Sequence, residues 1–330
     1  MTHCSIEHIQ HNISYLLFRY AFLYSLPIYC AAFIILFFQS STQMAIKYQY
    51  YRQILLNYVF VTLLTLVVCP ILVPPTPGYY ITGLLSTFSS NPGIALIVLT
   101  YSILAVALSI ILLIRHQLVS LSDLRFTSKF NIYIKCIRIL FIFCYLFFAL
   151  TGIGVLPVLF YEDEMLILRE EEYDKYNDSM LLCPDMFIAR ATEWRILLPY
   201  CLSALFGTIC SITGVASVIL CLLMMYSSRK MVSRETMNMQ WSFTISLIYQ
   251  AIVYIICIII PVGIISALFY SNIHMPEHGI YYLIMIALQG TATNFMHIVP
   301  FFYKLWDKKN RVNGGNRSEV SRTVSNIGMY

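Results

Sequence analysis

The chain has 330 residues, of which 59% are hydrophobic and only 11% are charged, and its formal net charge is +5. Soluble domains carry about 25% charged residues, so this composition excludes a protein whose whole surface faces water. The small positive charge does not indicate a nucleic-acid-binding protein; its distribution along the chain is more informative than its sum.

Seven long stretches that lack Asp, Glu, Lys and Arg follow one another along the chain. A helix needs about 20 mostly apolar residues to cross the hydrocarbon core of a bilayer. Pro74 and Pro75 end the second stretch, because consecutive prolines remove backbone donors, and Asn91-Pro92-Gly93 introduces the third. The predicted spans are residues 20–39, 54–73, 93–114, 139–161, 196–226, 242–270 and 280–303.

These spans predict an all-α integral membrane protein whose solvent is the lipid bilayer. The expected organisation is an amino-terminal segment at residues 1–19, a seven-helix bundle at residues 20–303 and a basic tail at residues 304–330. Basic residues resist translocation and therefore collect in cytosolic segments. Sixteen of the 21 Lys and Arg residues fall in the first, third and fifth connections and in the tail. We therefore expect the amino terminus outside and the tail in the cytosol.

The ten cysteines do not indicate a disulfide-rich secreted protein, because seven of them lie inside the predicted spans, where a thiol behaves as a small hydrophobic group. Cys4 and Cys183 are the two expected outside, where they could pair as a disulfide. Asn12 and Asn177 each begin an Asn-x-Ser sequon on the predicted outer side. Both are candidate glycosylation sites.

The spans contain no ionisable Asp, Glu, Lys or Arg, which disfavours ion pumps and proton-driven transporters, since such proteins keep buried charges for function. The longest segment between spans, residues 162–195, carries no His or Cys cluster at metal-ligand spacing. We therefore expect neither an enzyme nor a protein with a metal or another cofactor.

Several short motifs resemble one family along nearly the whole chain. The basic step Arg115-His116 stands at the inner end of the third span, and Pro300 and Tyr303 keep the spacing of a Pro-x-x-Tyr motif at the end of the seventh. The other motifs are Ser25-Leu26-Pro27, Ser41-Thr42-Gln43-Met44, Ile54-Leu55-Leu56-Asn57 and the run GYYITGLLS at residues 78–86.

With these motifs the chain resembles the nematode serpentine chemoreceptors, closest to class H, with class I as its neighbour. The resemblance implies a seven-transmembrane bundle of G-protein-coupled receptor type in the plasma membrane of a sensory cilium. It implies a small-molecule ligand and a heterotrimeric G protein as partners. The chain departs from the family pattern where Leu113 and Ile114 replace Glu-Asn before Arg115. It also departs from the general receptor motif at the end of the seventh helix, where Val299 replaces the usual Asn.

A receptor pocket is expected in the outer half of the bundle, between helices. Candidate ligand contacts are polar side chains that the spans place there: Tyr101, Tyr200, Ser203, Tyr254 and Gln289. Gln289 is the most informative of them, because an amide in lipid needs a hydrogen-bond partner. Helix-to-helix hydrogen bonding would satisfy it equally well.

Candidate residues for G-protein coupling and activation lie at the cytosolic side. The basic ones would equally satisfy the topology rule or touch anionic lipid, and Pro300 is a candidate hinge in the seventh helix or a simple kink. The candidates are Arg115, His116, Arg125, Lys129, Arg229, Lys230, Arg234, Pro300 and Tyr303.

Two alternatives to a signalling receptor remain open. A passive facilitator of an uncharged solute needs no buried charge, so the uncharged spans are compatible with it. The missing carboxylate before Arg115 is compatible with a receptor partner that has no ligand of its own and works as a dimer.

Overall fold

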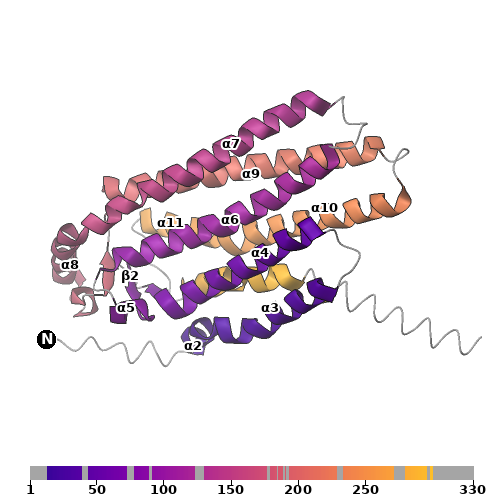
Figure 1. The fold of residues 1–330 in the computed structure, drawn as a ribbon. Helices are drawn as coiled ribbons and strands as arrows, with labels where there is room; N and C mark the ends of the chain where they lie inside the picture. The colour runs from indigo at the N-terminus through magenta and orange to yellow at the C-terminus, as the bar shows by residue number, and fades with distance from the viewer. Residues whose placement is uncertain are drawn as a thin grey trace, which may run out of the picture.

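The computed structural model describes residues 13–38, 44–72, 78–88, 91–122, 130–176, 179–183, 185–188, 190, 193–228, 233–270, 279–295 and 298–299. Long helices run side by side as one elongated bundle (Figure 1). They are α2 (Ile13–Arg19), α3 (Ala21–Phe38), α4 (Met44–Thr62), α6 (Gly93–Ser122), α7 (Asn131–Gly154), α9 (Trp194–Ser228), α10 (Arg234–Tyr254), α11 (Ile260–Tyr270) and a last helix at residues 279–295.

Each of the seven predicted spans overlaps at least one of these helices, and the sixth overlaps both α10 and α11, which confirms the predicted fold class. Among the described residues, six helical segments are long and apolar enough to cross a membrane: residues 21–38, 47–68, 93–122, 131–160, 194–228 and 240–267. The seventh predicted span is helical over residues 279–295 and 298–299.

The helix ends differ from the predicted ones. Helix α4 begins at Met44, α7 at Asn131 and α10 at Arg234, each eight or more residues before the predicted span. These extra turns carry polar and basic residues, and a helix satisfies its own backbone in water as well as in lipid. A search for uncharged stretches therefore finds the hydrocarbon crossing and misses the rest of the helix.

The second span ends earlier than predicted. It was expected to reach residue 73, but the π-helical turn η1 (Leu63–Val68) is followed by Cys69, whose φ of 43° lies in the left-handed region. The fourth was expected to reach residue 161, and its helical structure reaches Phe160 but changes type: α7 stops at Gly154, and the 3₁₀ helix η3 (Leu156–Phe160) follows, with Pro157 in its first turn.

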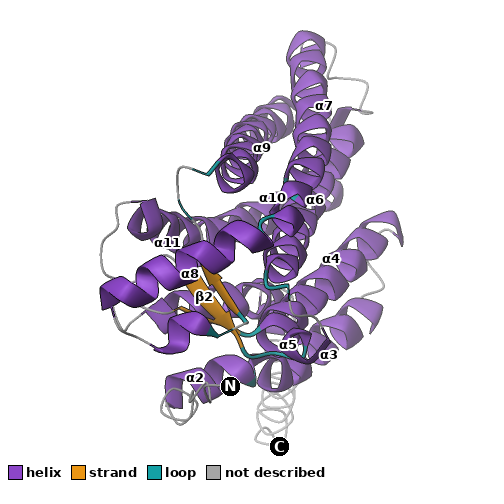
Figure 2. Cartoon of the chain, turned by 90° about the vertical axis from the view of Figure 1, so that its left-hand side faces the viewer, coloured by secondary structure: helices purple, strands orange, loops and turns teal. Residues whose placement is uncertain are grey.

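A cap of short strands and short helices lies at one end of the bundle (Figure 2). This is the end that the sequence predicts to be outside. The centre of the cap is an antiparallel sheet of β1 (Pro70–Leu72), β2 (Gly78–Ile81) and β3 (Met186–Ile188), in the order β1-β2-β3. Ile71 pairs with Tyr80, and Tyr79 with Phe187. Shorter helices surround the sheet: α5 (Leu85–Phe88), α8 (Glu162–Tyr176) and η4 (Ser179–Leu182).

The apolar interior has two large parts. The first lies under the cap and contains, among others, Tyr15, Phe60, Val106, Phe187 and Ile286. The second fills the opposite end, with Tyr50, Ile114, Phe141, Met224 and Leu247 among its members. The sheet of the cap is thus continuous with the core of the bundle, because β3 supplies side chains to the same cluster as the helices.

Candidate ligand and signalling sites

The cap is held together by Arg169, a buried arginine of α8 that is 5% exposed. Its Nε–H donates to the carbonyl oxygen of Met186 on β3 at 3.0 Å, and its Nη2 donates to the same oxygen. Burial lowers the pKa of the Arg169 guanidinium, and the nearby carboxylates of Glu162 and Asp185 oppose that shift. The arginine therefore fastens the acidic helix α8 to the edge of the sheet.

A second contact joins the two outer connections. The Tyr80 hydroxyl on β2 donates to Asp185 Oδ2 at 3.4 Å. Burial raises the pKa of the Asp185 carboxyl, against the opposing effects of Tyr80 and Arg169, and burial together with Asp185 raises the pKa of Tyr80 to about 12. Strands β2 and β3 are thus tied by a side chain as well as by their ladder.

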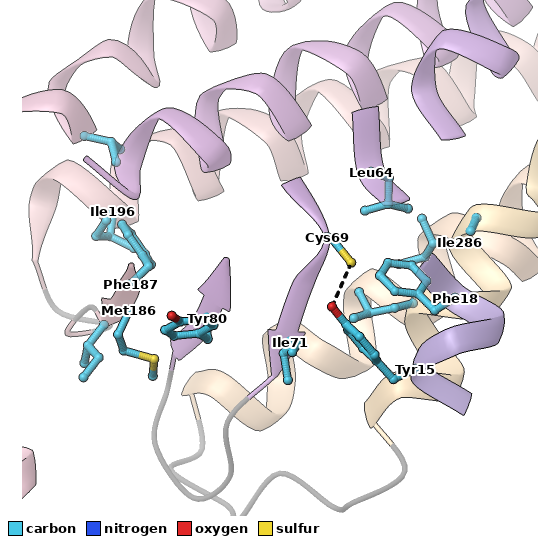
Figure 3. Packing of buried hydrophobic residues seen from close by; sticks show 14 of the residues in the cluster. Tyr15, Phe18, Leu64, Cys69, Ile71, Tyr80, Met186, Phe187, Ile196 and Ile286 are labelled. Atoms are coloured by element: carbon cyan, nitrogen blue, oxygen red, sulfur yellow. Dashed lines mark hydrogen bonds between the residues drawn. The ribbon is translucent and has the colours of Figure 1, made fainter. Parts of the chain in front are cut away.

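Helix α2 is fastened to the cap through Tyr15 (Figure 3). The Thr82 hydroxyl donates to the carbonyl oxygen of Cys69 at 2.8 Å, so the Tyr15 hydroxyl is the donor in its own 2.6 Å bond to Thr82 Oγ1. The thiol of Cys69 in turn donates to the Tyr15 oxygen at 3.5 Å. These bonds enclose the left-handed residue Cys69, where a side chain costs about 1–3 kcal/mol of backbone strain.

The start of α9 is also tied to the cap. Arg195 donates through Nη1 to the carbonyl oxygen of Phe160 at 2.8 Å and forms an ion pair with Glu164 Oε1 at 3.2 Å. These contacts connect the sheet to α2, to α8 and to the first turn of α9 at this end of the bundle (Figure 2).

The five predicted ligand residues occupy two kinds of environment. Tyr101 and Tyr200 are 39% and 41% exposed, and the Tyr101 hydroxyl donates to the carbonyl oxygen of Gly152 on α7 at 2.6 Å. Ser203 on α9 is half-buried. Tyr254 packs against both large parts of the core. Gln289 is fully buried, and its Nε2 donates to Thr293 Oγ1 at 3.3 Å. Of the five, Tyr254 and Gln289 are therefore the best placed to meet a ligand inside the bundle.

Two buried amides near Gln289 were missed by the sequence analysis. Asn57 on α4 and Asn294 on the last helix are each 1% exposed, and none of their amide atoms has a hydrogen-bond partner within the described part of the chain. The Gln289 Oε1 atom is also without a partner there. Buried amides are rarely left unpaired, so this part of the interior is suited to a water molecule or a polar ligand group. The sequence signal that could have identified Asn57 and Asn294 is an amide side chain within an otherwise apolar segment.

Polar contacts between helices surround these amides. Gln53, one turn before Asn57, donates to Gln250 Oε1 on α10 at 3.1 Å. Thr291 donates to Ser25 Oγ on α3 at 3.0 Å, and the Tyr249 hydroxyl donates to the carbonyl oxygen of Ala292 at 3.3 Å. The middle of the bundle therefore joins α3, α4, α10 and the last helix through polar side chains.

At the end opposite the cap, Arg115 contacts a tyrosine. The acidic residue that often precedes this arginine in the family pattern is absent here. Arg115 Nη1 donates to the Tyr145 hydroxyl on α7 at 2.8 Å, and the guanidinium carbon lies 5.7 Å from the Tyr145 ring centroid. Next to it, Gln117 donates through Nε2 to Gln240 Oε1 at 2.8 Å and to Thr244 Oγ1 at 3.2 Å, both on α10. These contacts link α6 to α7 and to α10, and the Gln117 contact was not predicted.

Of the other predicted coupling residues, the structure describes His116 fully and the backbone of Arg234. His116 is half-buried, and its Nε2 atom has no partner among the described residues. Arg234 begins α10, and its side chain lies outside the described set. The remaining predicted coupling, sequon and disulfide residues outside the described ranges are Arg125, Lys129, Arg229, Lys230, Pro300, Tyr303, Asn12, Asn177 and Cys4.

Cys183 is disulfide-bonded, whereas the other eight cysteines of the described chain are free thiols. Within the described ranges, no group of three or more His, Cys, Asp or Glu side chains is arranged to hold a metal ion.

The model of one protein family, the serpentine type 7TM GPCR chemoreceptors Srh, matches residues 11–301. The chain belongs to this family. The match covers most of the sequence, including the cap, and confirms the resemblance to class H. No curated protein and no solved structure matches the chain.

Srh membership makes this chain a seven-transmembrane chemosensory receptor and a multi-pass membrane protein. The family is a class of receptors and not of enzymes.

Proposed function

We propose that this Srh receptor binds a small organic ligand in the interior beneath the cap and activates a heterotrimeric G protein at the opposite end. The family match over residues 11–301 is the observation that carries the proposal. The proposed location is the plasma membrane of a sensory cilium, with the cap outside and residues 304–330 in the cytosol.

The polar interior supports this arrangement of sites. Gln289 lies deep in the bundle, and its Oε1, like the amide atoms of Asn57, lacks a partner among the described residues. A ligand donor that reaches Gln289 would replace a missing hydrogen bond, which favours binding because an unmade bond in the interior is costly. Since Gln289 shares its helix with Thr291 and Ala292, ligand contact there would act on the same helix that is hydrogen-bonded to α3 and α10.

A reporter assay tests the coupling part of the proposal. Cells that express the receptor with a G-protein reporter would be exposed to a panel of volatile and water-soluble organic compounds. The wild type is expected to respond to at least one compound, and Arg115→Ala combined with Tyr303→Ala to respond much less at equal surface abundance. Equal responses of the two proteins would contradict the assignment of Arg115 and Tyr303.

The orientation has a separate test. If the cap faces outside, replacing Asn12 and Asn177 together by Gln should abolish a glycosidase-sensitive shift in gel mobility. Asn316→Gln, in the Asn-x-Ser sequon of the tail, should leave the shift unchanged. An epitope at the carboxyl terminus should react only in permeabilised cells. Reaction of that epitope on intact cells would show that the orientation is wrong.

A further inference from the structure

A groove of about 370 Å³ runs between α3 and α4 on the outside of the bundle, where the two helices lie side by side (Figure 1). Leu26, Cys30 and Phe33 form its wall on α3, and Tyr51, Arg52 and Leu55 line it on α4. Phe33 and Leu55 are 47% and 62% exposed, so the groove opens toward the surroundings of the bundle. In a membrane protein those surroundings are lipid chains.

Arg52 is the one charged residue among the groove-lining side chains. Its Nε and Nη2 atoms are buried and have no hydrogen-bond partner within the part of the chain that the structure describes. Arg52 as a whole is half-buried. Guanidinium N–H groups that are removed from water and form no hydrogen bond destabilise the folded protein, because the lost hydration is not replaced by another contact. The Nε–Nη2 edge is the one that binds a carboxylate or phosphate through two parallel hydrogen bonds.

Neither wall of the groove can supply the missing anion. No Asp or Glu occurs between Glu7 and Asp123 in the sequence, so α3 and α4 are free of carboxylates. The three ion pairs of the described residues all lie in the cap segment, between residues 164 and 195. Among the described residues, Arg52 therefore lacks an anionic partner, and neither helix that forms the groove carries one.

The position of Arg52 along α4 fits a lipid headgroup. The helix begins at Met44, at the end of the bundle opposite the cap, so Arg52 lies about 12 Å along its axis from that end. Lys47, one and a half turns earlier, donates to the carbonyl oxygen of Phe37 at 3.4 Å and adds a second positive charge near this end of the groove. In the proposed orientation this is the cytosolic leaflet, which is rich in anionic lipids.

We propose that the α3–α4 groove binds an acidic phospholipid of the cytosolic leaflet, with its phosphate on Arg52 and one acyl chain along Leu26, Cys30 and Phe33. A rotation of the flexible Arg52 side chain presents its Nε–Nη2 edge to the phosphate. A soluble anion fits less well, because it has no acyl chain to cover the apolar walls, which face hydrocarbon. The assignment to the cytosolic leaflet rests on the proposed orientation; the lipid site itself needs neither an odorant nor a G protein.

A second groove provides the matched control. It has a volume of about 350 Å³, lies between α6 and α7, and is lined by Arg115 and Arg138. Arg115 already has Tyr145 as its partner, and both arginines are exposed. Arg138→Gln thus removes an arginine from a lipid-facing groove of the same end, without touching the α3–α4 groove.

The test uses purified full-length receptor in detergent, titrated with dioleoyl phosphatidylserine or dioleoyl phosphatidylcholine, with retained lipid counted by native mass spectrometry. The wild type is expected to retain one phosphatidylserine in preference to phosphatidylcholine. Arg52→Gln should bind it roughly tenfold more weakly, the scale of one lost charge-assisted contact. Cys30→Trp, which fills the groove, should weaken binding with Arg52 intact, and Arg138→Gln should leave it unchanged.

Several outcomes would overturn the proposal. One is equal phosphatidylserine retention by wild type and Arg52→Gln; another is an equal loss in Arg138→Gln, which would show only a general attraction to basic residues. Displacement of the lipid by millimolar inorganic phosphate would point to a soluble anion instead. The unfolding temperatures of wild type and Arg52→Gln, measured without lipid, show whether the variant is folded. They should be similar, because Arg52 has no partner among the described residues whose contact the change would remove. A failed lipid test leaves G-protein coupling unaffected, and a silent receptor can still retain the lipid.

Discussion

The hydroxyl of Tyr29 on α3 occupies the space in which a side chain at Gly290 would begin. A Cβ at that position would also lie 2.8 Å from the Cβ of Asn57 on α4. Only a glycine lets the last helix approach α3 and α4 this closely, in the manner of small residues at helix contacts in membranes. The same approach encloses the unpaired amide of Asn57.

Gly290→Ala should therefore destabilise the receptor by about 1–3 kcal/mol, the usual cost of adding a methyl group to a filled core. Thermal unfolding of the purified receptor measures the effect. Gly263→Ala on α11 is the control, because nothing lies within 4 Å of its added Cβ. Tyr29→Phe should restore part of the stability of Gly290→Ala, since it removes the nearest atom. Equal stability of the two alanine variants would contradict the close approach.

The bond between Tyr15 and Thr82 fastens α2 to the cap. Tyr15→Phe should lower the free energy of unfolding by about 1 kcal/mol, as expected for the loss of one hydrogen bond. Thr82→Val should lower it by more, because it also removes the bond from Thr82 to the carbonyl oxygen of Cys69. The double variant should cost less than the sum, because both changes remove the same interaction. Tyr20→Phe serves as the control, since Tyr20 is 48% exposed. Strict additivity would show that the two side chains act independently.

Gln117 holds α6 to α10 at the end where we place the G protein. If signalling requires these helices to separate, Gln117→Leu should raise ligand-independent signalling several-fold, since about 1 kcal/mol of hydrogen bonding no longer opposes the change. The measurement is basal reporter activity, normalised to surface abundance. Ser109→Ala is the control, because Ser109 bonds only to Val106 of its own helix. Unchanged basal activity in Gln117→Leu would argue against a role for this contact.

Cys183 is expected to pair with Cys4. Cys4→Ser and Cys183→Ser should lower surface abundance to the same extent, and the double variant should be no worse than either. Labelling of unreduced protein with a thiol reagent that reaches only exposed cysteines should gain one label in each single variant. Different losses in the two single variants would indicate another partner for Cys183.

Much of this fold could be predicted from the sequence because it follows from local composition. A segment without charged side chains for 20 residues is tolerable only in lipid, and lipid permits only structures that satisfy their own backbone hydrogen bonds, of which the helix is the simplest. The seven helices, their order and the resemblance to class H were therefore readable without coordinates. The family match and the helices confirm those predictions.

The cap was not readable, because its strands are three or four residues long and β2 pairs with β3 across more than 100 residues of sequence, as Tyr79 does with Phe187. No local pattern distinguishes such strands from a loop; the pairing exists because the bundle brings the two outer connections to the same place. The same holds for Arg115, which has no carboxylate beside it in sequence and finds Tyr145 on the next helix.

The sequence by itself determined which segments lie in the membrane and to which family the chain belongs. Tertiary structure alone decided which polar groups meet. Arg52 lies in a predicted cytosolic connection, yet packing places it on a wall of the groove, with its Nε and Nη2 atoms buried and without a partner among the described residues. The physical reason is that transfer into lipid depends on each residue's own chemistry, whereas hydrogen bonding and ion pairing depend on neighbours that the chain supplies from a distance.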